Sequence, residues 1–209
     1  MTSKKIQIVR VTDRAVLDAE LVTGLRPEDL IDIDRQWLPL RQRVVRGLRD
    51  AGVPQENWPE SSGWNWVRKS AALKLMAIRG FGIRLEERWI GVSMINVAQF
   101  SAKLAPDQNK PLVYLEFIET APDCWPEKIA GVAPRFAGCG AQMLRQVVFE
   151  SVEEDFQGRV GLHSLDQSRS FYERHGMTVI EIDATKENLA YYEFTKETAA
   201  AFLRSGDKK

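Results

Sequence analysis

The chain has 209 residues, of which 44% are apolar, and it carries 29 basic and 29 acidic side chains. This length and apolar content suffice for one compact domain with a sizeable core, and the zero formal charge gives no overall field that would recruit nucleic acid or an anionic membrane. Because there is no charged-then-apolar leader, no run of about 18 apolar residues, no disulfide framework and no metal-ligand motif, we expect a cytoplasmic protein without bound metal.

The N-terminal third predicts one strand and two helices. Residues 6–11 (IQIVRV) partly alternate and predict a strand, and Thr12-Asp13 is a helix-start signal for a helix over residues 15–21. Residues 30–48 carry an apolar stripe at helical spacing, with Pro39 expected to kink or split the helix and Gly52 and Pro54 to end it.

Arginines recur along this second helix, and a loop rich in tryptophan follows it. A solvated helix face is a better interpretation of the arginines than an anion-binding patch; they are Arg41, Arg43, Arg46 and Arg49. The loop over residues 55–68 contains Trp58, Trp64 and Trp66, and a short helix is expected over residues 69–77.

Three strands occupy the middle of the chain. Residues 80–86 and 89–97 predict a hairpin that turns near Glu86-Glu87-Arg88, and residues 111–120 (PLVYLEFIET) predict a largely buried strand. A loop over residues 121–134, which contains Trp125, separates this third strand from the next motif.

Residues 135–140 read RFAGCG, an Arg-x-x-Gly-x-Gly turn before an amphipathic helix whose apolar positions include Met143, Leu144 and Val147. A helix N-terminus has unpaired backbone N–H groups and a partial positive charge, so it attracts phosphate, and Gly138 and Gly140 allow close approach. A triphosphate-binding loop would need Lys-Ser/Thr after the last glycine, where Ala141-Gln142 stand. Glycines that only permit close packing are the alternative.

The C-terminal third alternates between strands and helices. Residues 160–163 predict a strand, a helix follows from about Asp166 and stops at Gly176, and strands are expected over residues 178–183 and 189–194 before a helix over residues 196–204. Residues 171–177 read FYERHGM.

The Arg-x-x-Gly-x-Gly turn followed by Phe171-Tyr172-Glu173-Arg174-His175-Gly176-Met177 resembles the GNAT superfamily of N-acetyltransferases, well over residues 79–195 and in outline before that. The resemblance implies a mixed α+β fold (α/β in its layering), with a mostly antiparallel sheet of six to seven strands flanked by helices. It further implies a single domain over residues 1–209, with an enlarged helical and loop region (25–77) on the acceptor side and an acetyl-CoA-binding core (111–177).

In such a protein the turn would bind the pyrophosphate of acetyl-CoA, and the end of the third middle strand would bind the pantetheine. The residues implied are Ile118, Thr120, Arg135, Phe136, Ala137, Gly138, Cys139, Gly140 and Ala141. The loop over residues 121–134 is an insertion between these two segments, which leaves the pantetheine contacts open. Cys139 is interpreted as a small space-filling residue of the turn rather than as a reactive thiol.

Acetyl transfer to an amine requires loss of a proton from the acceptor ammonium and protonation of the CoA thiolate. Tyr172 matches the tyrosine that often serves as general acid in this family. Glu116 and Glu119 are the candidate bases; they are three apart and would face opposite sides of a regular strand. His163 is a weaker alternative.

The acceptor, a small-molecule or protein amine, would bind near the tryptophan-rich loop, where Trp64, Trp66 and Trp125 could form its wall. The same side chains could instead be core. The alternative function is a catalytically silent CoA-binding or interaction module. The strand over residues 189–194 could be an edge that pairs across a homodimer.

Overall fold

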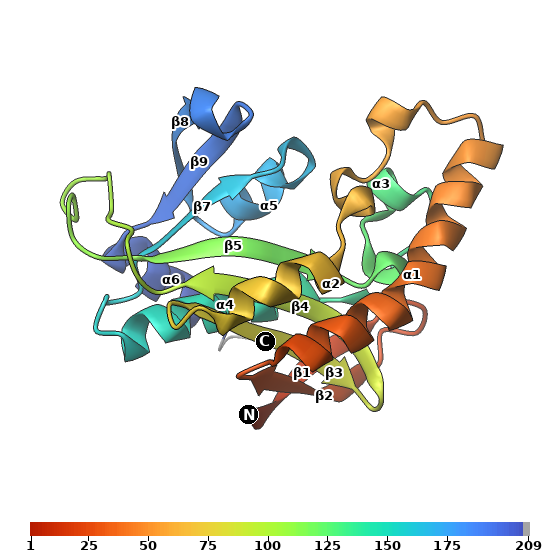
Figure 1. Cartoon of the computed structure of the whole chain (residues 1–209), viewed down its shortest axis with the longest axis horizontal. Coiled ribbons are helices and arrows are strands. Elements are labelled where there is room, and N and C mark those ends of the chain that lie inside the picture. Colours follow the sequence, from red (N-terminus) through yellow and green to blue (C-terminus); the bar gives the residue numbers. More distant parts are fainter. Residues whose placement is uncertain (207–209) are drawn as a thin grey trace. The chain divides into compact units, whose positions relative to one another are not determined.

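The computed structural model describes residues 1–206, and residues 207–209 of the predicted domain lie outside that range. The described strands are β1 (Thr2–Arg10), β2 (Val16–Thr23), β3 (Ile78–Leu85), β4 (Arg88–Asn96), β5 (Val113–Thr120), β6 (Phe136–Ala137), β7 (Val160–Ser164), β8 (Thr178–Asp183) and β9 (Leu189–Phe194). The helices are α1 (Pro27–Asp50), α2 (Trp66–Lys69), α3 (Glu127–Ala130), α4 (Cys139–Glu153), α5 (Arg169–Arg174) and α6 (Lys196–Gly206), joined in places by 3-10 turns (Figure 1).

Over residues 1–206 the strands form one sheet in the order β6-β1-β2-β3-β4-β5-β7-β9-β8. The β5–β7 pair is parallel, whereas β1–β2, β2–β3, β7–β9 and β8–β9 are antiparallel. The predicted mixed, mostly antiparallel sheet with flanking helices is therefore confirmed. The strand number was wrong, because the described sheet has nine strands rather than six or seven.

One of the two unexpected strands is β2, where a helix over residues 15–21 was predicted. The segment pairs with β1 from Thr2↔Thr23 to Val9↔Val16. Asp13 accepts the backbone N–H of Ala15 at 3.1 Å, and Arg14 adopts a positive φ of 58°. The Thr-Asp signal therefore begins a tight hairpin turn. The sequence VLDAELVT puts Asp18 and Glu20 on the opposite face to Ala19 and Leu21, which is the period of a strand.

Helix α1 is the predicted long helix, and it runs through Pro39 without being split. Pro27 occupies its first turn, where a missing N–H costs nothing, and the N–H of Arg26 donates to the Asp29 carboxylate at 2.8 Å. Its buried side chains recur at helical spacing: Leu30, Ile33, Asp34, Trp37, Arg41, Val44 and Leu48. The short helix expected over residues 69–77 is instead α2 followed by a 3-10 turn, η3 (Ser70–Lys74).

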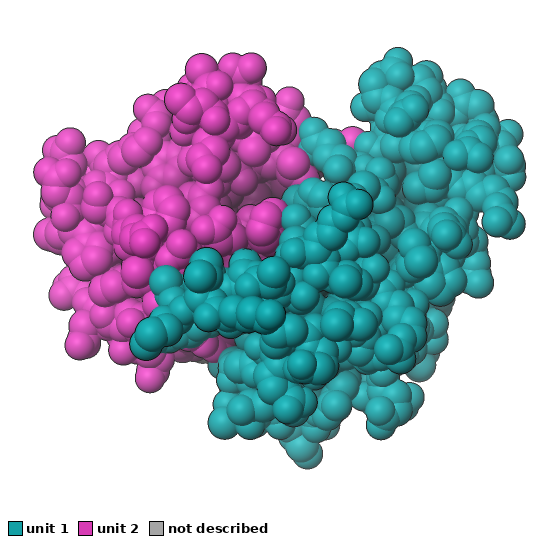
Figure 2. Space-filling model, viewed as in Figure 1, with its two compact units in different colours: residues 1–93, 118–143 teal, residues 94–117, 144–209 magenta. Residues whose placement is uncertain are grey.

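The chain divides into two compact units, residues 1–93 with 118–143 and residues 94–117 with 144–209 (Figure 2). The first unit includes β1 to β3, α1 and α2, with a core around Leu30, Ile33 and Trp37. The second includes β7 to β9, and one of its buried clusters is formed by Ala102, Leu112, Tyr114 and Tyr191. The single domain proposed from the sequence stays a prediction.

The prediction that residues 189–194 form an edge strand was wrong. Strand β9 pairs with β7 on one side and with β8 on the other, so its backbone is hydrogen-bonded along both sides. Strand β8 ends the sheet in the second unit, although it comes before β9 in the sequence. A homodimer formed through residues 189–194 is therefore not supported.

Candidate active site

The Arg-x-x-Gly-x-Gly turn is held in place by backbone pairing within the first unit. Strand β6 pairs with β1 through Val9↔Ala137 and Arg10↔Phe136. The N–H of Arg135 donates to the carbonyl of Asp123 at 2.7 Å. The turn is thus fixed from both sides before α4 begins, and this two-residue strand is too short to give a periodic signal in the sequence.

Gly138 has the backbone conformation that the turn requires. Its φ is +92°, a value that side chains with a Cβ rarely adopt, and no atom lies within 4 Å of the place where a Cβ would stand. The N–H of Gln142 donates to the Gly138 carbonyl at 3.0 Å, which begins the helical ladder of α4. The N–H groups of residues 139–141 precede that ladder, so they have no partner within α4.

Arg135 adds a cation beside this helix start. Its side chain is 54% exposed, and its Nη1 lies 3.8 Å from Asp123, whose carboxylate has a closer partner in Arg88 at 2.8 Å. The guanidinium also lies over the ring of Phe136, 5.3 Å from its centroid. Arg135 is therefore a solvent-accessible hydrogen-bond donor beside the start of α4.

Glu119, near the end of β5, lies in a buried polar cluster that we call the Glu119 cluster: Asp34, Arg41, Trp66 and Glu119. Arg41 donates from one nitrogen to both Glu119 oxygens at 3.3 Å, and Trp66 Nε1 donates to Oε2 at 2.6 Å. Asp34 accepts the backbone N–H of Trp66 at 2.9 Å. The cluster joins α1 and α2 to the strand end at which pantetheine was expected.

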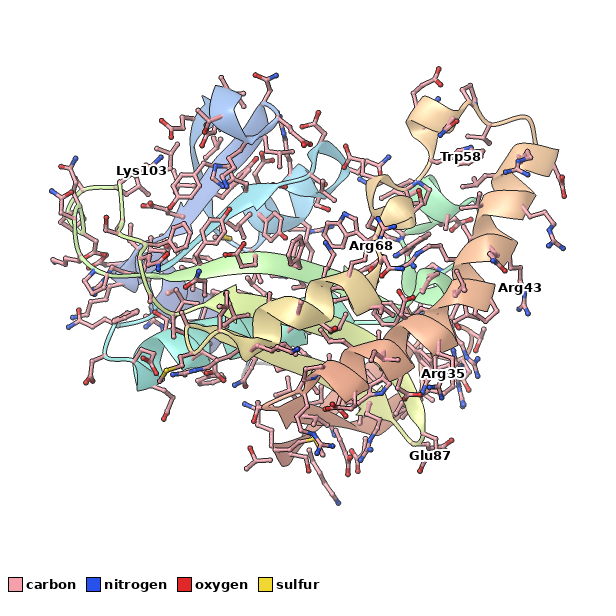
Figure 3. The ribbon with its side chains drawn as sticks, viewed as in Figure 1. Arg35, Arg43, Trp58, Arg68, Glu87 and Lys103 are labelled. Carbon is pink, nitrogen blue, oxygen red and sulfur yellow. The ribbon has the colours of Figure 1, made fainter. Side chains whose placement is uncertain are left out.

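Arg41 was the missed member of this cluster, because it was interpreted as part of a solvated face. It is buried, whereas Arg43 is exposed and projects from α1 (Figure 3). The signal was present in the spacing, since Arg41 falls four residues after Trp37 and three before Val44, on the apolar stripe of α1.

Burial raises the proton affinity of Glu119. It raises the pKa of Glu119 from 4.5 to about 7, although Arg41 and the hydrogen bond from Trp66 act in the opposite direction. Burial also lowers the pKa of Lys69, against the attraction of Glu119. A carboxyl that exchanges its proton near neutral pH can accept one from a substrate ammonium.

The three tryptophans assigned to the acceptor site have different surroundings. Trp64 is partly exposed, whereas Trp66 and Trp125 are buried, with Trp66 fully so. Trp125, in the inserted loop, packs in a cluster with Val44, Leu48 and Ala130. The loop therefore packs on the C-terminal part of α1, where Trp58 also lies against the cluster.

Tyr172 is placed on α5 in the second unit and is buried. Burial raises the pKa of its hydroxyl well above the ordinary value of 10. Its ring lies edge-on to Phe171. The group is therefore protonated at neutral pH and can donate.

The other candidate bases have different partners. Glu116 is half-buried and accepts from Asn96 Nδ2 at 3.3 Å. His163 has both ring nitrogens engaged, Nδ1 with the Tyr114 hydroxyl at 2.6 Å and Nε2 with Asp183 at 3.1 Å. Burial lowers the pKa of His163. Its contacts are those of a structural histidine.

Cys139, the variable residue of the turn, is 2% exposed, and burial raises the pKa of its thiol to about 12. The side chain fills space rather than serving as a nucleophile. Within residues 1–206, no three His, Cys, Asp or Glu side chains are grouped to hold a metal ion. Among the described helices none is long and apolar enough to cross a membrane.

Solved structures resemble the chain across most of its length. An acetyltransferase of the GNAT family from Listeria monocytogenes matches 90% of this chain and 99% of its own, with a TM-score of 0.52 and 14% identity. The chain has the fold of the GNAT acetyltransferases.

Two further structures share the GNAT fold with this chain. A putative GNAT-family acetyltransferase from Desulfovibrio desulfuricans covers 85% of this chain and 99% of its own, with a TM-score of 0.50 and 13% identity. Aminoglycoside acetyltransferase AAC(6')-Ib, solved with coenzyme A and kanamycin, covers 88% and 98%, with a TM-score of 0.52 and 13% identity. No family model and no curated protein matches the sequence itself.

Proposed function

We propose that the protein is an N-acetyltransferase that moves the acetyl group of acetyl-CoA to an amine of a small molecule or protein. The observation that carries the proposal is the turn before α4, with Gly138 at φ +92° and open space beside it, in a chain that has the GNAT fold. The N–H groups of residues 139–141 and the guanidinium of Arg135 would bind the pyrophosphate, and the backbone of Ile118 and Thr120 would bind the pantetheine.

Glu119 is proposed as the base. Its pKa of about 7 lets it take a proton from the acceptor ammonium at neutral pH, which a carboxyl with an ordinary pKa does poorly. The neutral amine then attacks the thioester carbon, a C–N bond forms, and the C–S bond breaks with its electrons going to sulfur. Tyr172 is proposed to protonate the departing thiolate and to regain a proton from the nitrogen, which loses its second proton as the amide forms. Glu116 stays the second candidate base.

The donor site is tested by Arg135→Glu, with Arg43→Glu as the matched control for the same change of charge at an exposed arginine. Calorimetric titration with acetyl-CoA should show binding weakened about 10- to 100-fold in Arg135→Glu, the value of a lost charge-assisted hydrogen bond, and unchanged in Arg43→Glu. S-acetylpantetheine, which lacks the pyrophosphate, should bind both variants equally.

A wild-type protein that is folded but does not bind acetyl-CoA would remove the acetyltransferase proposal. Binding without transfer to any amine would favour the catalytically silent module. A loss that is equal in Arg135→Glu and Arg43→Glu would show that the turn is not the phosphate site.

A further inference from the structure

Lys69, the last residue of α2, holds its amine against two tryptophan rings. Its Nζ lies 4.6 Å from the Trp64 ring centroid and 5.9 Å from that of Trp66. The two rings meet edge to face, at 6.2 Å between centroids and 78° between planes. Because ring faces attract an ammonium group, they restrict where this flexible side chain can place its nitrogen.

The same arrangement connects the amine to the proposed donor site. Trp66 donates to the Glu119 carboxylate at 2.6 Å, and Glu119 lies between Ile118 and Thr120 on β5. The amine, the two rings and the carboxylate belong to one unit of the chain, the unit that also contains the phosphate-binding turn. Lys69 and the strand end that is proposed to bind pantetheine therefore both contact the same side chain, Trp66.

The chemical state of this amine differs from that of a solvated lysine. Burial lowers its pKa, although the charge of Glu119 acts to raise it. An ordinary lysine, with a pKa of about 10.4, is neutral in only about one molecule in 2,500 at pH 7, and each unit of decrease raises that fraction about tenfold. The Lys69 side chain is only partly buried, so part of it is open to solvent.

We propose that Lys69 is itself an acceptor of the acetyl group, so that the protein modifies its own chain at this residue. The inference rests on the proposed use of acetyl-CoA as donor. The ammonium first loses one proton, to Glu119 or to water. Nζ then attacks the thioester carbon, the N–C bond forms, and the C–S bond breaks with its electron pair on sulfur. The second proton leaves nitrogen and ends on the CoA thiolate.

The product would be an uncharged amide at the centre of this arrangement. N-acetyl-Lys69 would lose its attraction to the faces of Trp64 and Trp66, and Glu119 would lose a nearby positive charge. Because Glu119 is the proposed base, acetylation of Lys69 would change the rate at which the site handles other amines.

The experiment incubates the full-length protein with isotopically labelled acetyl-CoA and follows each lysine by peptide mass spectrometry. Lys74, five residues on and exposed in η3, is the matched control for uncatalysed acetylation in the same segment. Lys69 should be labelled about tenfold or more faster than Lys74 in the folded protein, because a bound donor would be held close to Lys69 alone, and at a similar rate after unfolding in urea.

Two variants sharpen the result. Lys69→Arg keeps the positive charge over the tryptophan rings but accepts no acetyl group under these conditions, so it should remove the fast label while leaving Lys74 unchanged. Arg135→Glu should slow labelling of Lys69 in proportion to its loss of donor affinity. Excess CoA should compete at Lys69 and not at Lys74.

Calorimetry on the same samples separates the two proposals. Donor binding with Lys69 and Lys74 labelled at equal rates would overturn the inference and leave the proposed function intact. Fast labelling of Lys69 that excess CoA does not slow would also overturn the inference, because the acetyl group would then be transferred without binding at the donor site. Absence of donor binding would remove both proposals.

Discussion

At the scale of single residues, the buried hydroxyl of Tyr172 has a raised pKa, which bears on its proposed role as a general acid. The hydroxyl keeps its proton across the physiological range, and its ring is fixed by the contacts with Phe171 and Tyr192, whose centroids lie at 5.2 Å and 6.1 Å. A general acid needs both properties, because it must hold a proton in a fixed place until the thiolate leaves.

Tyr172→Phe should therefore lower kcat about 100-fold, with little change in the affinity for acetyl-CoA. The matched control is Tyr192→Phe, which also loses one hydroxyl and frees Glu173 of α5 from a hydrogen bond of 2.8 Å. We expect that control to lose less than about tenfold, because it only loosens α5. Steady-state kinetics with each variant check this, and equal losses would assign Tyr172 a packing role.

At the scale of elements, the β3–β4 hairpin depends on glycines that face one another. A Cβ on Gly82 would lie 2.7 Å from the Gly91 carbonyl oxygen and 3.1 Å from the nearest atom of the Trp89 ring. Trp89 in turn supplies the carbonyl that accepts from Trp37 Nε1 at 2.8 Å, which ties α1 to β4. The missing side chain of Gly82 thus leaves room for the Gly91 carbonyl and the Trp89 ring of β4.

Gly82→Ala should destabilise the protein by about 1–3 kcal/mol, because the backbone oxygen and the large ring have little room to move. Gly47→Ala, at an exposed position in α1 with nothing within 4 Å of its Cβ position, should instead stabilise it by about 0.5–1 kcal/mol. Urea denaturation of the two variants measures both signs. Equal effects in the two would contradict this account of the hairpin.

For the whole molecule, the Glu119 cluster makes stability depend on pH. The pKa of Glu119 rises from 4.5 to about 7 on folding. Its stabilising contribution to the free energy of unfolding is therefore fully present below about pH 4.5 and is lost as the pH rises through 7. Relative to Glu119→Gln, which does not titrate, the wild type should lose about 3 kcal/mol between pH 4.5 and pH 8.

The free energies of unfolding of wild type and Glu119→Gln, measured across this range, provide the test. The difference between the two curves cancels the groups that titrate in both. A constant difference would mean that Arg41 keeps Glu119 ionised throughout, and it would remove the reason for proposing this carboxyl as the base.

Local sequence patterns predicted most of the helices and strands, because the spacing of apolar residues and the turn residues that specify them lie within a few positions of one another. The long helix α1, the hairpin of β3 and β4, and the turn before α4 all follow from spacing and turn chemistry. The strand β2 was predicted as a helix because Thr12-Asp13 serves equally as a helix cap and as a hairpin turn. Only pairing with β1 decides between them.

The sequence by itself determined the Arg-x-x-Gly-x-Gly turn before α4 and the FYERHGM segment around Tyr172, since each lies in contiguous residues, and the resemblance carried by these two motifs implied the mixed fold. Tertiary structure alone decided that Arg41 of α1 and Trp66 of α2 both donate to the Glu119 carboxylate of β5, and that β9 is not an edge strand. These features depend on segments far apart in the chain. Burial, which sets the pKa of a carboxyl or an amine, exists only after those segments have packed together.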